Sequence, residues 1–272
     1  MTLFTIISGF WYKNRPINKC VVLYLWPCLL FSIVNNILGY FSHFPNYLYT
    51  FKFSPGYAMW YLLALFIFSI STGPLIKKIG VVNSFTLICF MAILVGVFPI
   101  SNRILNCQRI TCLYPCFLFG VLLREKIGDG IYKFSSKYKF ICFSILFFII
   151  GFNLCVRSIP YIRQYDSFTK YYGLNYYAMI VKWGLYTLRL IACFCLIVLC
   201  SNKRTWYTNM GSKTLNAYLL HMVLIFPLCW GLLYELRYEW FALATAVFLI
   251  PVLCIFFMSD RIDRLMNYLL RK

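Results

Sequence analysis

Two side chains capable of acid-base or anion chemistry lie inside long apolar stretches of the sequence. Arg189 is near the middle of the apolar run 176–200, and His221 is the eighth residue of the run 214–234. A charge inside such a run is costly, so a functional role is the default interpretation. Arg189 would hold a phosphate or a thioester oxygen of a ligand, or it would donate to backbone carbonyls and a tyrosine. His221 would take a proton from a hydroxyl near neutral pH, or it would be a hydrogen-bonded packing residue.

A third candidate is the basic group Lys13, Arg15 and Lys19, which follows the first apolar run. The guanidinium of arginine is a fork of donors that fits phosphate. The group therefore predicts a clamp for a phosphorylated cytosolic donor. An orientation signal for a membrane protein would explain the same three charges equally well.

The other titratable residues add little to these candidates. Lys182 is close enough to the end of its apolar run to extend to the membrane interface, and we expect His43 to be solvated in a loop. All seven acidic residues fall in connections or at the edges of apolar runs. The absence of a carboxylate within a run disfavours a proton-driven pump and hydrolysis by paired carboxylates.

The composition around these residues excludes a soluble enzyme. Of 272 residues, 62% are hydrophobic and 12% are charged, whereas a soluble domain carries about 25% charge. A helix needs about 20 apolar residues to cross a bilayer. Apolar runs near that length recur along the whole chain, at 1–12, 20–41, 55–72, 81–99, 110–124, 138–156, 176–200, 214–234 and 238–258.

These runs predict an all-α polytopic transmembrane bundle of about nine helices, in a single domain over 1–272. The helix at 1–12 is half-length, because it would reach only about 18 Å. The run 110–124 is short and contains Pro115 and Gly120. We expect it to be a kinked span, or one that thins the bilayer locally.

The net charge of +19 lies mostly in short connections between the runs. There it favours anionic lipid headgroups over nucleic acid as the partner. If the residues after the first run are inside, 17 Lys and Arg fall in inside connections and 7 in outside ones. This predicts a multi-pass cell-membrane protein with a cytoplasmic carboxyl end. The longest polar connections are 125–137 inside and 157–175 outside. The tyrosines and cations of 157–175 would hold a sugar, or they would form an interfacial aromatic belt.

The 13 cysteines form no CxxC pair and no Cys/His cluster at zinc spacing. No metal site is predicted. Most of them fall inside apolar runs and are expected to be free, buried thiols, among them Cys142, Cys155, Cys193, Cys195, Cys200 and Cys254.

Four segments in order resemble the acyltransferase-3 superfamily of polytopic membrane acyltransferases, particularly its branch of sugar O-acetylases. Residues 211–221, GSKTLNAYLLH, resemble the family's "G-x-x-T/S-L-x-x-Y-L-L-H" helix start. Residues 59–66, MWYLLALF, are similar to its "LWFLxxLF" span, and 114–120, YPCFLFG, to its "PFFLxG" stretch. Residues 3–10, LFTIISGF, are similar to its "PLFFxISGF" span. The order and spacing match from Met1 to about Met258.

The resemblance implies about ten spans and an O-acyltransferase, most simply an O-acetyltransferase. An acyl group would pass from a cytosolic acyl-CoA such as acetyl-CoA to a hydroxyl of a cell-surface glycan or its lipid-linked precursor. No permanently bound cofactor is implied. The family's acyl-CoA stretch maps onto Lys13, Arg15 and Lys19, and its arginine in the span before the "YLLH" helix maps onto Arg189. Trp60 and Tyr218 would line the substrate cavity.

One part of the family pattern has no counterpart here. The family's first span, which carries the histidine held to activate the acceptor hydroxyl, would precede Met1. We therefore expect the acyltransferase domain to be N-terminally incomplete, with His221 as a less favoured general base. Two alternatives stay open, an inactive truncated family member and a glycan transporter or polymerase.

Overall fold

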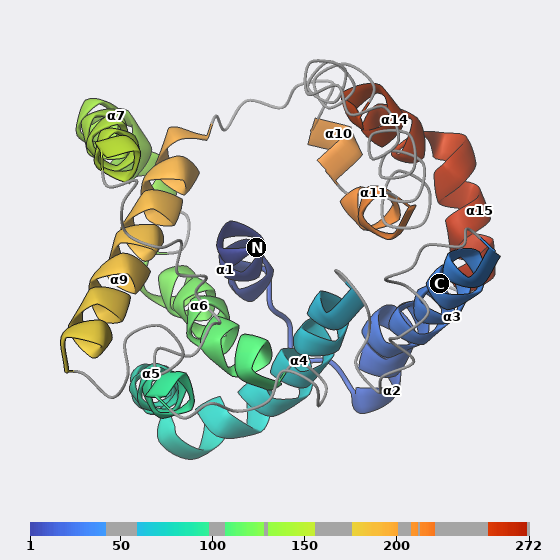
Figure 1. Ribbon diagram of the computed structural model, residues 1–272, viewed down its shortest axis with the longest axis horizontal. Coiled ribbons are helices and arrows are strands. Elements are labelled where there is room, and N and C mark those ends of the chain that lie inside the picture. Colours follow the sequence, from blue (N-terminus) through green and yellow to red (C-terminus); the bar gives the residue numbers. More distant parts are fainter. Residues whose placement is uncertain are drawn as a thin grey trace. The chain divides into compact units, whose positions relative to one another are not determined.

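The computed structural model describes an all-helical protein (Figure 1). The described residues are 1–41, 59–97, 107–127, 130–155, 176–200, 208–211, 213–220 and 250–270. No strand occurs in these ranges, which confirms the all-α class. The first helices are α1 (Thr2–Phe10), α2 (Ile17–Cys20), the π-helical turn η1 (Val21–Leu25), α3 (Trp26–Phe41), α4 (Trp60–Ile79), α5 (Val81–Val97) and α6 (Cys107–Lys126). They are followed by α7 (Gly130–Cys155), α9 (Tyr176–Leu199), α10 (Thr208–Gly211), α11 (Thr214–Leu220), α14 (Ile250–Phe257) and α15 (Asp260–Leu270).

Two helical segments within the described ranges are long and apolar enough to cross a membrane, Ile17–Val34 and Trp60–Ile79. The first runs without interruption from α2 through η1 into α3. Three further helices carry shorter apolar stretches, Val81–Val95, Tyr138–Gly151 and Trp183–Leu199. These apolar helices are consistent with the membrane association that the composition predicts.

Several predicted boundaries need correction. The polar connection predicted at 125–137 is helical from Gly130 onward, as part of α7. The short run 110–124 is part of the 20-residue helix α6, which includes Pro115. Both errors have one cause: hydropathy marks the apolar part of a helix, whereas the backbone stays helical through flanking residues whose long charged side chains extend to water.

The helix α15 lies beyond the last of the predicted apolar runs, which ends at 258. Its sequence has apolar residues spaced along one face of a short, charged helix, and such a helix is too polar to resemble a membrane span. The predicted runs 214–234 and 238–258 are described only at α11 and α14, and the rest of each lies outside the described residues.

A tight turn joins α4 to α5 at Gly80. Its φ of 79° is in the left-handed region, where glycine carries no Cβ penalty. The Gly80 N–H donates to the Ile76 carbonyl at 2.8 Å, and the Gly80 carbonyl accepts the Ser84 hydroxyl at 2.6 Å. The turn therefore caps one helix and begins the next within a single residue.

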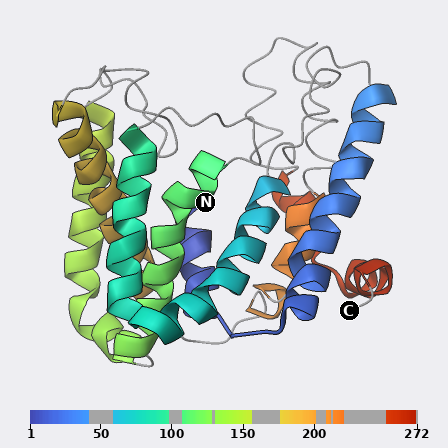
Figure 2. The same ribbon diagram turned by 90° about the horizontal axis from the view of Figure 1, so that it is seen from below.

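The chain divides into two compact units. Unit 1 comprises Met1–Asn14 and Ile67–Asn202, and unit 2 comprises Arg15–Phe66 and Lys203–Lys272. In unit 1, α6 packs against α1 and α5, and α7 packs against α9. Figure 2 shows α5, α6, α7 and α9 running in a common upright direction.

The contact between α1 and α6 depends on two glycines. A Cβ on Gly9 would overlap the Phe117 carbonyl, and a Cβ on Gly120 would overlap the Ile6 carbonyl. The two backbones thus approach each other closely at Gly9 and Gly120. Small residues allow this close packing between helices, because they leave no side chain in the contact. Two glycines far apart in sequence set the distance between α1 and α6.

Buried hydroxyls link α4 and α6 in unit 1. The Tyr114 hydroxyl lies 2.7 Å from Ser71 Oγ and 3.1 Å from Thr72 Oγ1. Ser71 already donates to the Ile67 carbonyl at 2.7 Å, so Tyr114 donates to Ser71 and accepts from Thr72. The Tyr114 ring also stacks on Phe68, with centroids 4.7 Å apart.

Unit 2 has its own apolar core. Its buried members come from α3, α4 with the residue before it, α11 and α15: Cys28, Phe31, Met59, Leu62, Leu219, Met266 and Leu270. Figure 1 shows α15 along its length and Figure 2 shows it end-on, whereas α3 runs upright in Figure 2. The helix α15 therefore crosses α3, and its residues Met266 and Leu270 close the end of this core.

The cysteines with described side chains are free thiols, in agreement with the prediction. Their burial agrees only in part. Cys142, Cys193 and Cys195 are buried, but Cys200 is exposed and Cys254 is half-buried. Cys200 follows the last residue of α9, and Cys254 lies in α14, which has several exposed residues. The position of a cysteine in an apolar run therefore does not ensure that its thiol is buried.

Candidate functional site

The basic stretch after α1 gains a further cation from α6. Arg124, in the last turn of α6, donates from Nη1 to the carbonyl of Tyr12 at 2.6 Å. Tyr12 immediately precedes Lys13, and both Lys13 and Arg124 are exposed. In the sequence, Arg124 is one of the 17 Lys and Arg of the predicted inside connections. Because α1 packs against α6, Arg124 lies beside the segment that contains Tyr12 and Lys13.

The helix α4 adds to the same region of unit 1. The Tyr12 hydroxyl donates to the Ser69 carbonyl at 3.3 Å. A Cβ on Gly73 would lie 2.8 Å from the side-chain oxygen of Asn14, so this segment packs closely on α4. One helical turn beyond Gly73, α4 ends with the exposed Lys77 and Lys78.

Four exposed cations of unit 1 lie on the segments that meet here, after α1 and in the last turns of α4 and α6: Lys13, Lys77, Lys78 and Arg124. We call this set the basic cluster. Only Lys13 of this set was predicted as a donor-binding residue. The other two predicted residues, Arg15 and Lys19, are exposed and belong to unit 2, with Lys19 in the last turn of α2.

The two predicted cavity residues of unit 2 are linked through a third aromatic ring. Trp60 meets Tyr61 edge-on, with centroids 6.2 Å apart, and Tyr61 meets Tyr218 edge-on at 6.0 Å. Trp60 and Tyr61 are 5% and 6% exposed, so these rings are packed inside the unit. Tyr61 belongs to the quoted motif at 59–66, but it was not singled out from the sequence.

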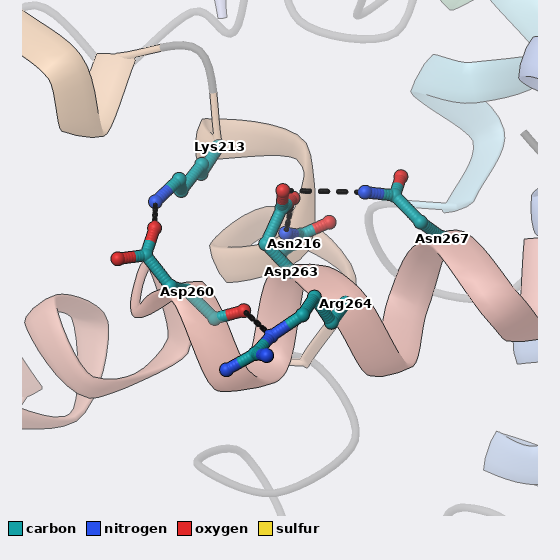
Figure 3. A network of polar contacts seen from close by, with 6 residues as sticks. All are labelled: Lys213, Asn216, Asp260, Asp263, Arg264 and Asn267. Carbon is teal, nitrogen blue, oxygen red and sulfur yellow. Dashed lines mark hydrogen bonds and ion pairs between the residues drawn. The ribbon is translucent and has the colours of Figure 1, made fainter.

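A polar network holds the helix that carries Tyr218 (Figure 3). The Asn216 side-chain amide donates to the Asp263 carboxylate at 2.7 Å, and Asn267 donates to the other oxygen of that carboxylate at 3.2 Å. At the start of α11, the ammonium of Lys213 pairs with Asp260. The first turn of α15 thereby provides both acceptors that hold α11.

These contacts differ in how much they are expected to contribute to stability. Asn216 is only 4% exposed, so an unpaired amide there would be costly. Asp260 is fully exposed, and water screens its ion pair with Lys213. The hydrogen bond and charge of Lys213 still lower the pKa of the Asp260 carboxyl below its ordinary value of 3.8.

The remaining predicted site residues lie in α9 or outside the described residues. Arg189 is half-buried in α9 of unit 1, and Lys182 lies in the same helix. His221 follows Leu220, the last residue of α11, but both His221 and His43 lie outside the described residues. The catalytic assignment of His221 and Arg189 stays a prediction.

Comparisons with protein-family models, curated proteins and solved structures find no match. The candidate site therefore has to be interpreted from its own residues.

Proposed function

We propose that this chain is a membrane-bound O-acyltransferase that moves an acyl group from cytosolic acyl-CoA to a hydroxyl of a cell-surface glycan or its lipid-linked precursor. Acetyl-CoA is the proposed donor substrate. The proposal places the chain in the cell membrane as a polytopic bundle of about nine helices with a cytoplasmic carboxyl end. Acceptor, lipid and donor are then its only necessary partners.

The observation that carries the proposal is the basic cluster of unit 1. Its four exposed cations lie on segments that contact one another, and Arg124 is held beside the segment after α1 by its hydrogen bond to the Tyr12 carbonyl. Coenzyme A carries several phosphate groups, and cations with arginine forks are suited to bind them. An orientation signal requires no such convergence of α1, α4 and α6, since it depends only on which connections hold the charges.

The aromatic residues of unit 2 support the acceptor side of the proposal. Trp60 and Tyr61 are buried, and Tyr61 packs edge-on against the half-buried Tyr218. The ring and phenol hydroxyl of Tyr218 are therefore the groups suited to contact a sugar. Tyr218 is three residues before His221 in the segment that resembles the family's "YLLH" helix. In this proposal the imidazole of His221 takes the proton of the acceptor hydroxyl, and the oxygen forms the ester as CoA leaves as its thiol.

Reconstituted protein tests the proposal directly. Proteoliposomes carrying the full chain and a lipid-linked saccharide fraction are given radiolabelled acetyl-CoA on the basic-cluster side. We expect alkali-labile label on the saccharide and an equal amount of free CoA. No labelled ester and no released CoA would overturn the acyltransferase proposal and leave the inactive family member or the glycan transporter.

Variants then test the donor site. Arg124→Gln and Lys13→Gln are each expected to weaken acetyl-CoA binding about tenfold, as loss of one charged contact to a phosphate predicts. The control is Lys139→Gln, which removes an exposed cation from α7. If all three variants bind acetyl-CoA equally well, the basic cluster is not part of the donor site, even if acyl transfer occurs.

A further inference from the structure

The helix α15 has a second face that the core of unit 2 does not use. Residues that face α3 and α11 recur at helical spacing, and they are Ile262, Asp263, Met266, Asn267 and Leu270. The opposite face is exposed and mixes cations with large apolar side chains, in Arg261, Arg264, Leu265, Tyr268 and Leu269. The exposed fractions of Leu265, Tyr268 and Leu269 are 53%, 82% and 46%.

The charges of α15 are divided between its two sides. Its acidic residues serve α11, since Asp260 pairs with Lys213 and Asp263 accepts from Asn216. Its two arginines lie on the exposed face, and the Arg264 Nε donates to the Asp260 carbonyl of the same helix at 3.4 Å. The exposed face is therefore cationic and apolar, although the helix as a whole has as many acids as arginines.

The connection before α15 places this face near a bilayer surface. The helix α14 is strongly apolar, with Val252, Ile255 and Phe256 exposed. Only Met258 and Ser259 separate it from α15, which crosses the direction of α3 in Figure 2. A short amphipathic helix that directly follows an apolar one, and crosses the neighbouring span, has the geometry of an interfacial helix.

We propose that the exposed face of α15 binds the surface of a bilayer that contains anionic phospholipid. Leu265 and Leu269 enter the boundary of the acyl chains, Tyr268 lies at headgroup level, and Arg261 and Arg264 bind lipid phosphates. The inference rests on the membrane placement in the proposed function and not on acyl transfer. Lipid binding orders α15, and α15 in turn holds α11 through Asp260 and Asp263.

Amide exchange of the full chain in lipid nanodiscs tests this inference. Discs that hold one copy are prepared with phosphatidylcholine alone or with added phosphatidylglycerol. Exchange over residues 260–270 is expected to slow when phosphatidylglycerol is added. At about 1 kcal/mol per arginine near an anionic surface, the two arginines together predict a change of about 30-fold. High salt is expected to reduce it.

Two double variants separate the charge from the apolar contact. R261Q with R264Q is expected to abolish the effect of phosphatidylglycerol, whereas Leu265→Ser with Leu269→Ser speeds exchange in both lipids. Lys139→Gln is the control cation and leaves exchange in α15 unchanged. An unchanged thermal midpoint of the arginine variant shows that it is folded, as expected for exposed side chains.

Three results would overturn the inference. Equal exchange in both lipids would show that α15 makes no contact with anionic lipid. A phosphatidylglycerol effect that persists in R261Q with R264Q would show that other residues bind the anionic lipid. Slowing that appears only in discs holding two copies identifies the occupant as a second copy of the chain. Absence of acyl transfer in the same preparation contradicts the proposed function but leaves lipid binding by α15 intact.

Discussion

The carboxylate of Asp263 in α15 accepts a hydrogen bond from the side-chain amide of Asn216 in α11, at 2.7 Å. Asn216 is buried, and Tyr218 and Leu219 follow it in the same short helix. The described part of α11, Thr214–Leu220, is joined to α15 by both polar and apolar contacts. Its position therefore depends on this hydrogen bond and on the packing of Leu219 with Met266 in the core of unit 2.

Removal of the Asp263 carboxylate is expected to destabilise α11. Asp263→Ala leaves the buried Asn216 amide without its acceptor, which costs about 1–3 kcal/mol. Asp263→Asn keeps an acceptor oxygen and is expected to lose less. Thermal unfolding and amide exchange over 213–220, measured in nanodiscs, check the prediction.

A double-variant cycle with Asn216→Ala controls for effects of Asp263 on α15 alone. If the hydrogen bond acts as described, the second substitution adds little once the first is made. Fully additive losses would show that Asp263 stabilises α15 without holding α11.

The ion pair between Lys213 and Asp260 gives the link between α11 and α15 a dependence on pH. The pKa of Asp260 is lowered in the folded protein, so folding favours the ionised carboxylate. The stabilising effect is complete above the unfolded pKa and is lost as the pH falls through the folded pKa. We expect exchange in α11 to accelerate below about pH 4, by a small factor because the pair is exposed.

Lys213→Gln is the matched variant for this dependence. Without the ammonium, the Asp260 pKa returns toward its ordinary value, and the exposed pair contributes nothing at any pH. A variant with the same acid response as the wild type would assign that response to other carboxylates.

The glycine contact between α1 and α6 predicts strong sensitivity to a single methyl group. In Gly120→Ala, the new Cβ would meet the Ile6 carbonyl and the Phe10 amide nitrogen, so the helices must separate. Overpacking of this kind costs about 1–3 kcal/mol. We expect a lower thermal midpoint and a parallel loss in Gly9→Ala.

Gly151→Ala is the control, because nothing lies within 4 Å of a Cβ at that position of α7. It is expected to be neutral or slightly stabilising, since alanine favours a helix over glycine. Equal losses in Gly120→Ala and Gly151→Ala would contradict the close approach of α1 and α6.

The Tyr114 hydroxyl is expected to contribute little to stability beyond its ring. Tyr114→Phe keeps the stack on Phe68 but removes the hydrogen bonds to Ser71 and Thr72. Hydrogen bonds between membrane helices contribute about 0.6 kcal/mol on average, so the thermal midpoint should fall only slightly. Tyr114→Ala also removes the ring and should cost several times more; similar losses for the two variants would show that the hydroxyls dominate.

The class of the fold could be predicted from the sequence because it depends on local patterns. Apolar runs such as 176–200 correspond closely to helices such as α9, since a long apolar segment without proline satisfies its own backbone groups as a helix. Charge was less informative. Arg124 is counted only among the cations of the predicted inside connections, and no local pattern indicates that its guanidinium donates to the Tyr12 carbonyl, 112 residues away in sequence.

What the sequence by itself determined was the all-α class, the membrane-like composition and the identity of the cations, aromatics and histidine available for chemistry. Only the tertiary structure decided which of them meet: Arg124 with the stretch after α1, Tyr61 between Trp60 and Tyr218, and Asp263 with Asn216. The physical reason is the distance along the sequence over which each interaction acts. Helix formation depends on hydrogen bonds four residues apart, whereas these contacts depend on how closely helices approach, and glycines such as Gly9 and Gly120 set that approach only once their partners are in place.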